Sequence, residues 1–313
     1  MSRLDSRHLL GLKEVSADDI TMILDTAETF REVLDRPVKK LPTLRGVTVL
    51  NLFYEPSTRT KISCELAEKR LSADTVGFST STSSVKKGES LRDTVQNIEA
   101  MKIDMIVVRH KSSGVPYYLT QCTESNIINA GDGSHEHPTQ ALLDMFTIRK
   151  KYGKLDGLRV VLIGDVKHSR VIRSNIWGLK AMGASVALCG PSTLMPFEVE
   201  QFGCDVYTNL DEALEGADVV NIMRLQLERQ QAGLFPSQRE YTNLFGVTRD
   251  RLSRLNENFT IMHPGPMNRG VEIASDVADG NNAVILDQVT NGQAVRMAVL
   301  YLLSAPVEQE EQQ

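Results

Sequence analysis

The segment Asn51–Lys61 reads NLFYEPSTRTK and joins an apolar stretch to a helical pattern through a turn rich in hydroxyl and cationic side chains. Together with the four residues before it, the start of this segment forms the β-branched and apolar run Val47–Phe53, which predicts a buried strand. After the turn, apolar residues recur at helical spacing and predict a helix over Thr60–Arg70. The chain is therefore expected to run from strand to turn to helix here, as in a protein of the α/β class.

The turn itself has the composition of an anion site. Ser57 and Thr58 are natural N-cap residues. Unpaired N–H groups and the helix dipole attract anions to a helix N-terminus, and Arg59 and Lys61 add positive charge to it. Phosphate is the predicted ligand. The alternative is an ordinary capped helix whose basic side chains are solvated.

Length and composition restrict the remaining possibilities. With 313 residues, 41% hydrophobic and 24% charged, the chain is expected to form two soluble globular domains. A formal net charge of -5 argues against bulk nucleic-acid binding. The N-terminal residues show no signal-peptide pattern, and no run approaches the roughly 18 apolar residues of a membrane span. The predicted location is therefore cytoplasmic. The cysteines form no CxxC pair, which argues against a zinc site and against disulfides; they are Cys64, Cys122, Cys189 and Cys204.

Strand patterns alternate with helical patterns along most of the chain. Strands are predicted at Val47–Phe53, Asp104–Val108, Ile127–Ala130, Val160–Ile163, Ser185–Leu188, Val219–Met223 and Thr260–Met262. Helices are predicted at Ala17–Leu34, Thr60–Arg70, Leu91–Met101, Gln140–Tyr152, Arg170–Met182, Leu210–Glu215 and Gln293–Leu303. This alternation predicts parallel sheets flanked by helices. The linker-like segment 150–157 falls close to midway, so two domains are expected, 1–150 and 151–289, joined by interdomain helices. The C-terminal helix within 290–305 is expected to pack back on the first domain.

Arginine, histidine and amide side chains follow nearly every predicted strand. In open parallel sheets ligands bind beyond the carboxyl ends of the strands. Arg109 and His110 come after one strand, Arg170 and Arg224 come soon after two others, and the sequence His263–Pro266 follows the last. The site is therefore expected to be rich in hydrogen-bond donors and cations, which suits a polyanionic substrate and a developing oxyanion.

Two further segments allow a functional and a plain interpretation. His137 and Gln140 share one helix face with Asp144, so an imidazole and a carboxamide could hold one carbonyl oxygen and its NH₂ group; His137 could also simply cap the helix. His135 with His137 suggests a metal only weakly, because no third ligand is evident. The loop Ser83–Glu89 could close over a bound anion, with Gly88 as its hinge, or it could be an ordinary solvated surface loop. It lacks the spacing of a P-loop, so a nucleotide triphosphatase is not supported.

Taken together, four motifs resemble those of the carbamoyltransferase family. They are Ser57–Thr60, Arg109–His110, His137–Asp144 and His263–Pro266, in family order and spacing, and the resemblance runs from about Leu41 to Leu303. The ornithine branch of that family carries a Ser-Met-Gly loop and a His-Cys-Leu-Pro turn, which do not occur here. Arg170 and Arg224–Arg229 look instead like the carboxylate clamps of the aspartate branch.

The resemblance implies roles for individual residues. Ser57, Thr58, Arg59 and Thr60 would hold the phosphate of carbamoyl phosphate. Arg109 and His137, together with Thr60, would donate to the carbonyl oxygen of the same substrate, and Gln140 would bind its NH₂ group. The backbone around Gly265 and Pro266 would lie near the reacting groups. Aspartate would be bound by Arg170, Arg224, Gln226 and Lys87. Ser83 and Lys87 would reach in from a neighbouring subunit, which implies a homotrimer. Glu55 and Arg229 look like ion-pair partners that steady the closed state.

The implied activity is carbamoyl transfer from carbamoyl phosphate to the α-amine of aspartate, the committed step of pyrimidine biosynthesis. Domain 1–150 would bind carbamoyl phosphate and domain 151–289 aspartate, with no cofactor and no metal. Lys61 stands where the family usually has arginine, and Cys64 replaces a commoner aromatic and is expected to be core packing. Alternatives are transfer to ornithine or another amine, and a non-catalytic family member. A regulatory chain or a dihydroorotase is a possible partner; nucleic acid and membrane are not expected.

Overall fold

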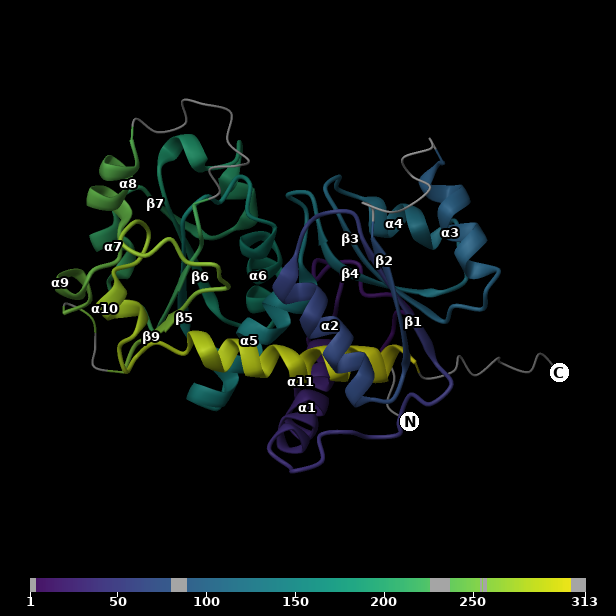
Figure 1. Cartoon of the computed structure of the whole chain (residues 1–313). Coiled ribbons are helices and arrows are strands. Elements are labelled where there is room, and N and C mark those ends of the chain that lie inside the picture. The colour runs from purple at the N-terminus through teal and green to yellow at the C-terminus, as the bar shows by residue number, and fades with distance from the viewer. Residues whose placement is uncertain (1–3, 80–88, 226–236, 254, 256–257, 305–313) are drawn as a thin grey trace. The chain divides into compact units, whose positions relative to one another are not determined.

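The computed structural model describes residues 4–79, 89–225, 237–253, 255 and 258–304, and the chain divides into two compact units (Figure 1). Unit 1 is Met1–Gly11, Asp18–Gly133 and Gly292–Gln313; unit 2 is Leu12–Ala17 and Ser134–Asn291. Each unit contains one parallel sheet with helices on its faces, which confirms the predicted α/β class. The assignment of 1–150 and 151–289 to separate substrates stays a prediction.

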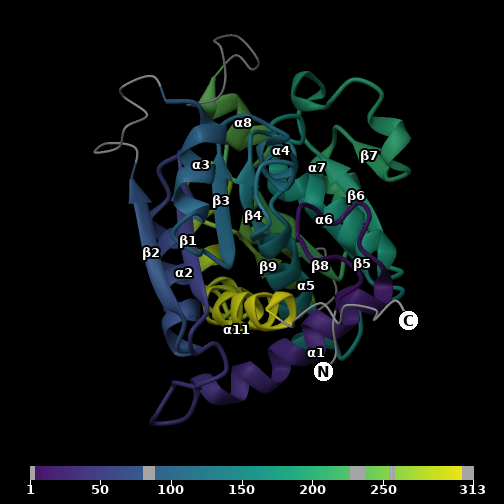
Figure 2. The same cartoon turned by 90° about the vertical axis from the view of Figure 1, so that its right-hand side faces the viewer.

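The sheet of unit 1 has four parallel strands in the order β2-β1-β3-β4, seen side by side in Figure 2. The strands are β1 (Thr48–Phe53), β2 (Asp74–Ser79), β3 (Met105–His110) and β4 (Asn126–Asp132). The helices are α1 (Ala17–Leu34), α2 (Thr58–Arg70), α3 (Leu91–Glu99), α4 (Val115–Thr120) and the later turns of α11 (Ile285–Leu303).

Alternation of side chains along β1 decides what covers each face of this sheet. Leu50 and Leu52 belong to a buried cluster with Val95 of α3 and Leu119 of α4. Asn51 points to the opposite face, where its amide donates to Glu68 of α2 at 2.9 and 2.8 Å. Figure 1 shows α2 and α3 on opposite faces of the sheet. The helix that begins at the candidate anion turn therefore lies directly on β1.

The sheet of unit 2 has five parallel strands in the order β7-β6-β5-β8-β9. They are β5 (Arg159–Ile163), β6 (Ser185–Cys189), β7 (Asp205–Tyr207), β8 (Val219–Ile222) and β9 (Thr260–Met262). The helices are α5 (Pro138–Tyr152), α6 (Arg170–Ala181), α7 (Leu210–Leu214), α8 (Gln238–Phe245), α9 (Arg249–Leu252) and α10 (Ser275–Ala278), with 3₁₀ turns at Ser192–Leu194 and Val199–Phe202.

The two faces of the second sheet also differ. Ile163 and Ile222 belong to the buried cluster that includes residues of α7 and α8. On the other face, Asn221 of β8 donates to Asp144 of α5, and the hydroxyl groups of Tyr152 and Thr260 lie 2.9 Å apart. Helix α5 therefore packs against β8 and β9. In the described part of the chain, no helix is both long and apolar enough to cross a membrane.

Several elements were not predicted from the sequence. β2 and β7 are edge strands, one containing Gly77 and the other only three residues long, so neither has the apolar run of a central strand. The last helix begins at Ile285 and not at Gln293, and Gly292, a residue of low helix propensity, lies within it. The short helices α4, α8, α9 and α10 have only four to eight residues each, too few for a helical period to stand out in the sequence.

Candidate active site

In unit 1 the anion turn and Arg109 lie at the same edge of the sheet. β1 and β3 are neighbouring parallel strands, and Arg109 pairs in register with Phe53, the last residue of β1. Ser57–Thr60 follow Phe53 after three residues. The structure thus brings two of the predicted groups together at the carboxyl ends of adjacent strands, where α/β sheets bind their ligands.

Ser57 occupies the N-cap position of α2 but does not act as a capping side chain. Its backbone is extended, with φ of -160°, and its hydroxyl makes no capping hydrogen bond. By contrast, Ser90, Ser169 and Ser237 each accept a bond from a backbone N–H at the start of α3, α6 and α8. The predicted cap position is confirmed, while its hydroxyl is not used by the helix. That arrangement suits an external anion better than a plain cap.

Arg109 is held by two oxygen atoms. Its Nη1 donates to the carbonyl oxygen of Ala130 at 3.2 Å, and its Nη2 lies 3.5 Å from Oε1 of Glu55. Both side chains are largely buried, at 12% and 19% exposed. The predicted ion-pair residue Glu55 therefore pairs with Arg109 here. These contacts orient the guanidinium in a site where Arg109 is expected to donate to a carbonyl oxygen.

Other side chains of α2 support the turn. Lys61 Nζ lies 3.9 Å from Glu65 Oε1 on the same helix, which agrees with a supporting position. Cys64 is buried, as expected for core packing, and burial raises the pKa of its thiol to about 12. Ser63 accepts hydrogen bonds at its hydroxyl from Gln293 (2.5 Å) and Arg296 (2.9 Å) of α11. The first turns of α2 are thereby anchored to the C-terminal helix within unit 1.

In unit 2, His137 occupies the N-cap position of α5 and is 4% exposed. Its side chain makes no capping hydrogen bond, so the plain interpretation of His137 as a helix cap is not what the structure shows. Its backbone N–H donates to Ser174 Oγ at 2.8 Å, and that hydroxyl donates to the buried Glu136 at 2.8 Å. Pro138 is the first helical residue, where its missing N–H costs nothing.

Gln140 follows on the same helix and donates from Nε2 to Oδ1 of Asp144 at 3.0 Å. Asp144 is fully buried, and burial raises the pKa of its carboxyl to about 6 although several amide hydrogen bonds oppose that rise. The sequence placed Asp144 on the face of His137 and Gln140 but assigned it no role. Its other partners are distant in sequence, so no local pattern could have found them.

The predicted aspartate ligands Arg170 and Arg224 follow neighbouring strands. Ile163 of β5 pairs with Ile222 of β8, and Arg224 lies two residues after that pair. Arg170 is the first residue of α6, after the loop that leaves β5, and is 4% exposed. Both arginines thus leave the same edge of one sheet.

The turn after β9 belongs to the same sheet edge, because β9 is the neighbour of β8. The backbone N–H of Gly265 donates to Nδ1 of His263 at 2.8 Å, and the Gly265–Pro266 peptide bond is cis. Nδ1 accepts, so the proton of the neutral ring lies on Nε2, which faces the buried Glu272 at 3.4 Å. The turn is therefore fixed from within by a buried histidine.

Some predicted residues cannot be placed. Ser83, Lys87, Gln226 and Arg229, with the suggested hinge Gly88, lie outside the described residues. Among the residues that are described, no group of three or more His, Cys, Asp or Glu side chains could hold a metal ion. His135 is exposed, and the weak metal hypothesis built on it gains no support.

Family models match both halves of the chain. One, described as the carbamoyl-P binding domain of aspartate/ornithine carbamoyltransferase, matches residues 7–150. The other, described as the Asp/Orn binding domain of the same family, matches residues 156–303. The chain belongs to the aspartate/ornithine carbamoyltransferase family.

Curated relatives and solved structures of this carbamoyltransferase family are similar over nearly the whole chain. The aspartate carbamoyltransferase catalytic subunit of Gemmatimonas aurantiaca is 60% identical, covering 95% of this chain and 93% of its own. That of Halothermothrix orenii is 58% identical, covering 96% of each. The aspartate transcarbamoylase of Trypanosoma cruzi, solved with carbamoyl phosphate, is 30% identical with a TM-score of 0.87 and 96% of each chain covered.

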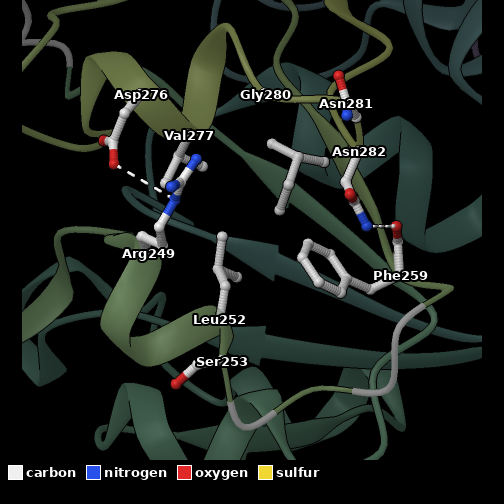
Figure 3. A pocket seen from close by; sticks show the side chains of 10 residues that line it. Arg249, Leu252, Ser253, Phe259, Asp276, Val277, Gly280, Asn281 and Asn282 are labelled. Carbon is white, nitrogen blue, oxygen red and sulfur yellow. Dashed lines mark hydrogen bonds and ion pairs between the residues drawn. The ribbon is translucent and has the colours of Figure 1, made fainter.

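A pocket elsewhere in unit 2 of this carbamoyltransferase lies apart from the predicted ligands. Figure 3 shows Leu252, Phe259 and Val277 around it, with an ion pair of 3.7 Å between Arg249 and Asp276 at its edge. Phe259 directly precedes β9, so the pocket lies toward the amino end of that strand. The predicted ligands follow the carboxyl ends, and none of them lines this pocket.

Proposed function

We propose that this chain transfers the carbamoyl group of carbamoyl phosphate to the α-amine of L-aspartate, giving N-carbamoyl-L-aspartate and phosphate. The relatives that cover almost the whole chain at 55 to 60% identity are aspartate carbamoyltransferase catalytic subunits. Family membership supports the carbamoyl donor, since its models describe a carbamoyl phosphate domain and an amino-acid domain.

The observation that carries the choice of aspartate is the position of Arg170 and Arg224. They follow the carboxyl ends of the adjacent strands β5 and β8, so their two guanidinium groups can bind the same small ligand. A dicarboxylate needs two cationic partners, whereas the side chain of ornithine is itself positive and would be repelled. Gln226 and Lys87 complete the proposed aspartate ligands.

Carbamoyl phosphate is proposed to bind through its phosphate to Ser57–Thr60. The uncapped position of Ser57, the start of α2 and the cation of Arg59 support that choice. Arg109, His137 and Thr60 are proposed to donate to the carbonyl oxygen. Gln140 is proposed to accept from the NH₂ group, and the backbone at Gly265 and Pro266 to lie near the reacting carbon.

The proposed mechanism is direct attack by the amine of aspartate on the carbamoyl carbon, through a tetrahedral intermediate. The site would contribute orientation and oxyanion stabilisation, mainly by Arg109 and His137. Arg59 would neutralise the departing phosphate. Since no side chain among the proposed ligands is an evident general base, the leaving phosphate is proposed to accept the proton of the amine.

The proposed assembly is a cytoplasmic homotrimer in which Ser83 and Lys87 serve the site of a neighbouring subunit. It would act at the committed step of pyrimidine biosynthesis, without a cofactor, alone or with a regulatory chain or a dihydroorotase. Native mass, measured with and without co-purifying proteins, tests this proposal. A mass of three chains agrees with it, and an active monomer contradicts it.

The residue-level test is Arg59→Ala, with phosphate release and carbamoyl-aspartate formation as readouts. Turnover is expected to fall about 10²–10³-fold, because the variant loses the cation beside the phosphate. Lys69→Ala is the matched control: it removes the same charge from the exposed, opposite end of the same helix. Near-normal turnover in Arg59→Ala, or an equal loss in both variants, contradicts the phosphate site.

A further inference from the structure

Asp144 is surrounded by amide donors from four different elements of unit 2. It is fully buried on α5. Its Oδ1 accepts hydrogen bonds from Gln140 Nε2 at 3.0 Å and from Gln288 Nε2 at 2.8 Å. Its Oδ2 accepts from Asn175 Nδ2 at 2.9 Å and from Asn221 Nδ2 at 3.3 Å. A single buried carboxylate thus binds helices α5, α6 and α11 and strand β8 through their side chains.

The chemistry of these partners fixes the orientation of the Gln140 amide. An ionised carboxylate only accepts hydrogen bonds, so each amide must present its NH₂ group to Asp144. The orientation of Gln288 is fixed a second time, because its Oε1 accepts the backbone N–H of His263 at 2.9 Å. With Nε2 of Gln140 turned to Asp144, the amide oxygen of Gln140 is the atom left to face a ligand.

Gln288 extends the same network to the turn after β9. It lies between Asp144 on one side and His263 on the other. His263 in turn accepts the N–H of Gly265 at 2.8 Å. One glutamine of α11 therefore joins the group that orients Gln140 to the group that shapes the turn at Gly265.

We propose that Asp144 is a positioning residue that holds the amide of Gln140 with its oxygen toward the substrate, so that Gln140 selects a ligand bearing an NH₂ donor. The proposal rests on the proposed function, in which Gln140 meets the NH₂ group of carbamoyl phosphate. If the amide turned around, its own NH₂ would face the NH₂ of the substrate and no hydrogen bond could form. Asp144 itself touches neither substrate.

The test compares carbamoyl phosphate with acetyl phosphate, which carries a methyl group in place of NH₂. Asp144→Asn keeps the size of the side chain but can present an NH₂ group to Gln140, which lets the Gln140 amide turn. The affinity for carbamoyl phosphate is expected to fall about 10–100-fold, because the NH₂ group of the bound substrate loses the amide oxygen of Gln140 as its hydrogen-bond acceptor. The affinity for acetyl phosphate is expected to change less than about 3-fold, because it donates nothing to Gln140.

Three comparisons separate positioning from general damage. Gln140→Ala should show the same selective loss, and adding Asp144→Asn to it should lower the affinity for carbamoyl phosphate little further. Thr147→Val is the matched control: it lies on the same helix and removes a buried hydrogen bond, the 3.0 Å bond from Asn291. It should leave the ratio of the two affinities unchanged. If Asp144→Asn does not fold, Gln288→Met takes its place. It should also lower the affinity for carbamoyl phosphate relative to that for acetyl phosphate, by a smaller factor.

Equal losses of affinity for both phosphates overturn the positioning role, and so does a full additional loss when Asp144→Asn is added to Gln140→Ala. Affinities are measured by calorimetry and so do not depend on turnover. A wild-type chain that binds carbamoyl phosphate but does not carbamoylate aspartate contradicts the proposed function alone. Loss of selectivity in Asp144→Asn would still support the role of Asp144.

Discussion

The buried carboxylate of Glu68 is expected to make stability fall as pH rises toward neutrality. Glu68 is 0% exposed on α2, and both of its oxygens accept from the amide of Asn51 on β1. Burial raises the pKa of Glu68 from its ordinary value of 4.5 to about 7, and the amide of Asn51 opposes that rise. The carboxyl group is therefore mostly protonated in the folded chain at pH 6, where it would be ionised in the unfolded chain.

The sign follows from proton linkage. The folded state binds this proton more tightly, so the stabilisation is fully present below pH 4.5 and is lost as pH rises through about 7. The difference in proton affinity corresponds to about 3 kcal/mol, and most of this stabilisation is lost between pH 5 and pH 8.5. Glu68→Gln replaces the titrating carboxyl group with a neutral amide of the same shape. That amide can form a hydrogen bond with the amide of Asn51.

The assay is denaturant unfolding of wild type and Glu68→Gln at pH 5 and pH 8.5. The free energy of unfolding of Glu68→Gln minus that of wild type is expected to be about 2–3 kcal/mol larger at pH 8.5 than at pH 5, because wild type loses stability over this range and the variant does not. Glu65→Gln is the control, since its half-buried carboxylate on the same helix is reached by water. A difference between Glu68→Gln and wild type that is the same at both pH values would refute the reasoning.

Two further variants test the candidate site, and a third tests a close backbone approach after β5. Glu55→Gln removes the charge 3.5 Å from Arg109 and is expected to lower turnover about 10-fold, with the fold unchanged by circular dichroism; unchanged turnover contradicts an orienting role. Arg224→Ala is expected to raise the KM for aspartate at least about 10-fold while the KM for carbamoyl phosphate stays constant, and the reverse pattern contradicts the assignment. In Gly164→Ala the new Cβ would lie 3.1 Å from the carbonyl oxygen of Met223 at a φ of +133°. Thermal unfolding should show a loss of about 2 kcal/mol, and wild-type stability would contradict that close approach.

The parts of the fold that sequence predicted are those with a local signal. β1, the turn at Ser57–Thr60 and α2 follow from an apolar run, a capping residue and a helical period that adjoin one another. The positions of Arg109 and Arg224 follow from the rule that ligands meet the carboxyl ends of parallel strands. Residue roles beyond that came from the resemblance of four motifs to a family.

The parts that sequence missed depend on contacts between distant residues. The partners of Asp144 lie 31, 77 and 144 residues away in the chain, so no spacing pattern could join them. Edge strands such as β2 need only one neighbour and carry little apolar signal. The unused hydroxyl of Ser57 is likewise invisible in sequence, since serine at an N-cap normally indicates a capping bond.

The most direct test of the proposed activity is to identify the carbamoylated product. The purified chain is incubated with carbamoyl phosphate and either L-aspartate or L-ornithine, and products are identified by mass spectrometry while phosphate is measured. N-carbamoyl-L-aspartate and phosphate are expected in equal amounts with aspartate, and no carbamoylated product with ornithine. Carbamoylated ornithine without carbamoyl-aspartate, or phosphate release without any carbamoylated amine, would contradict the account.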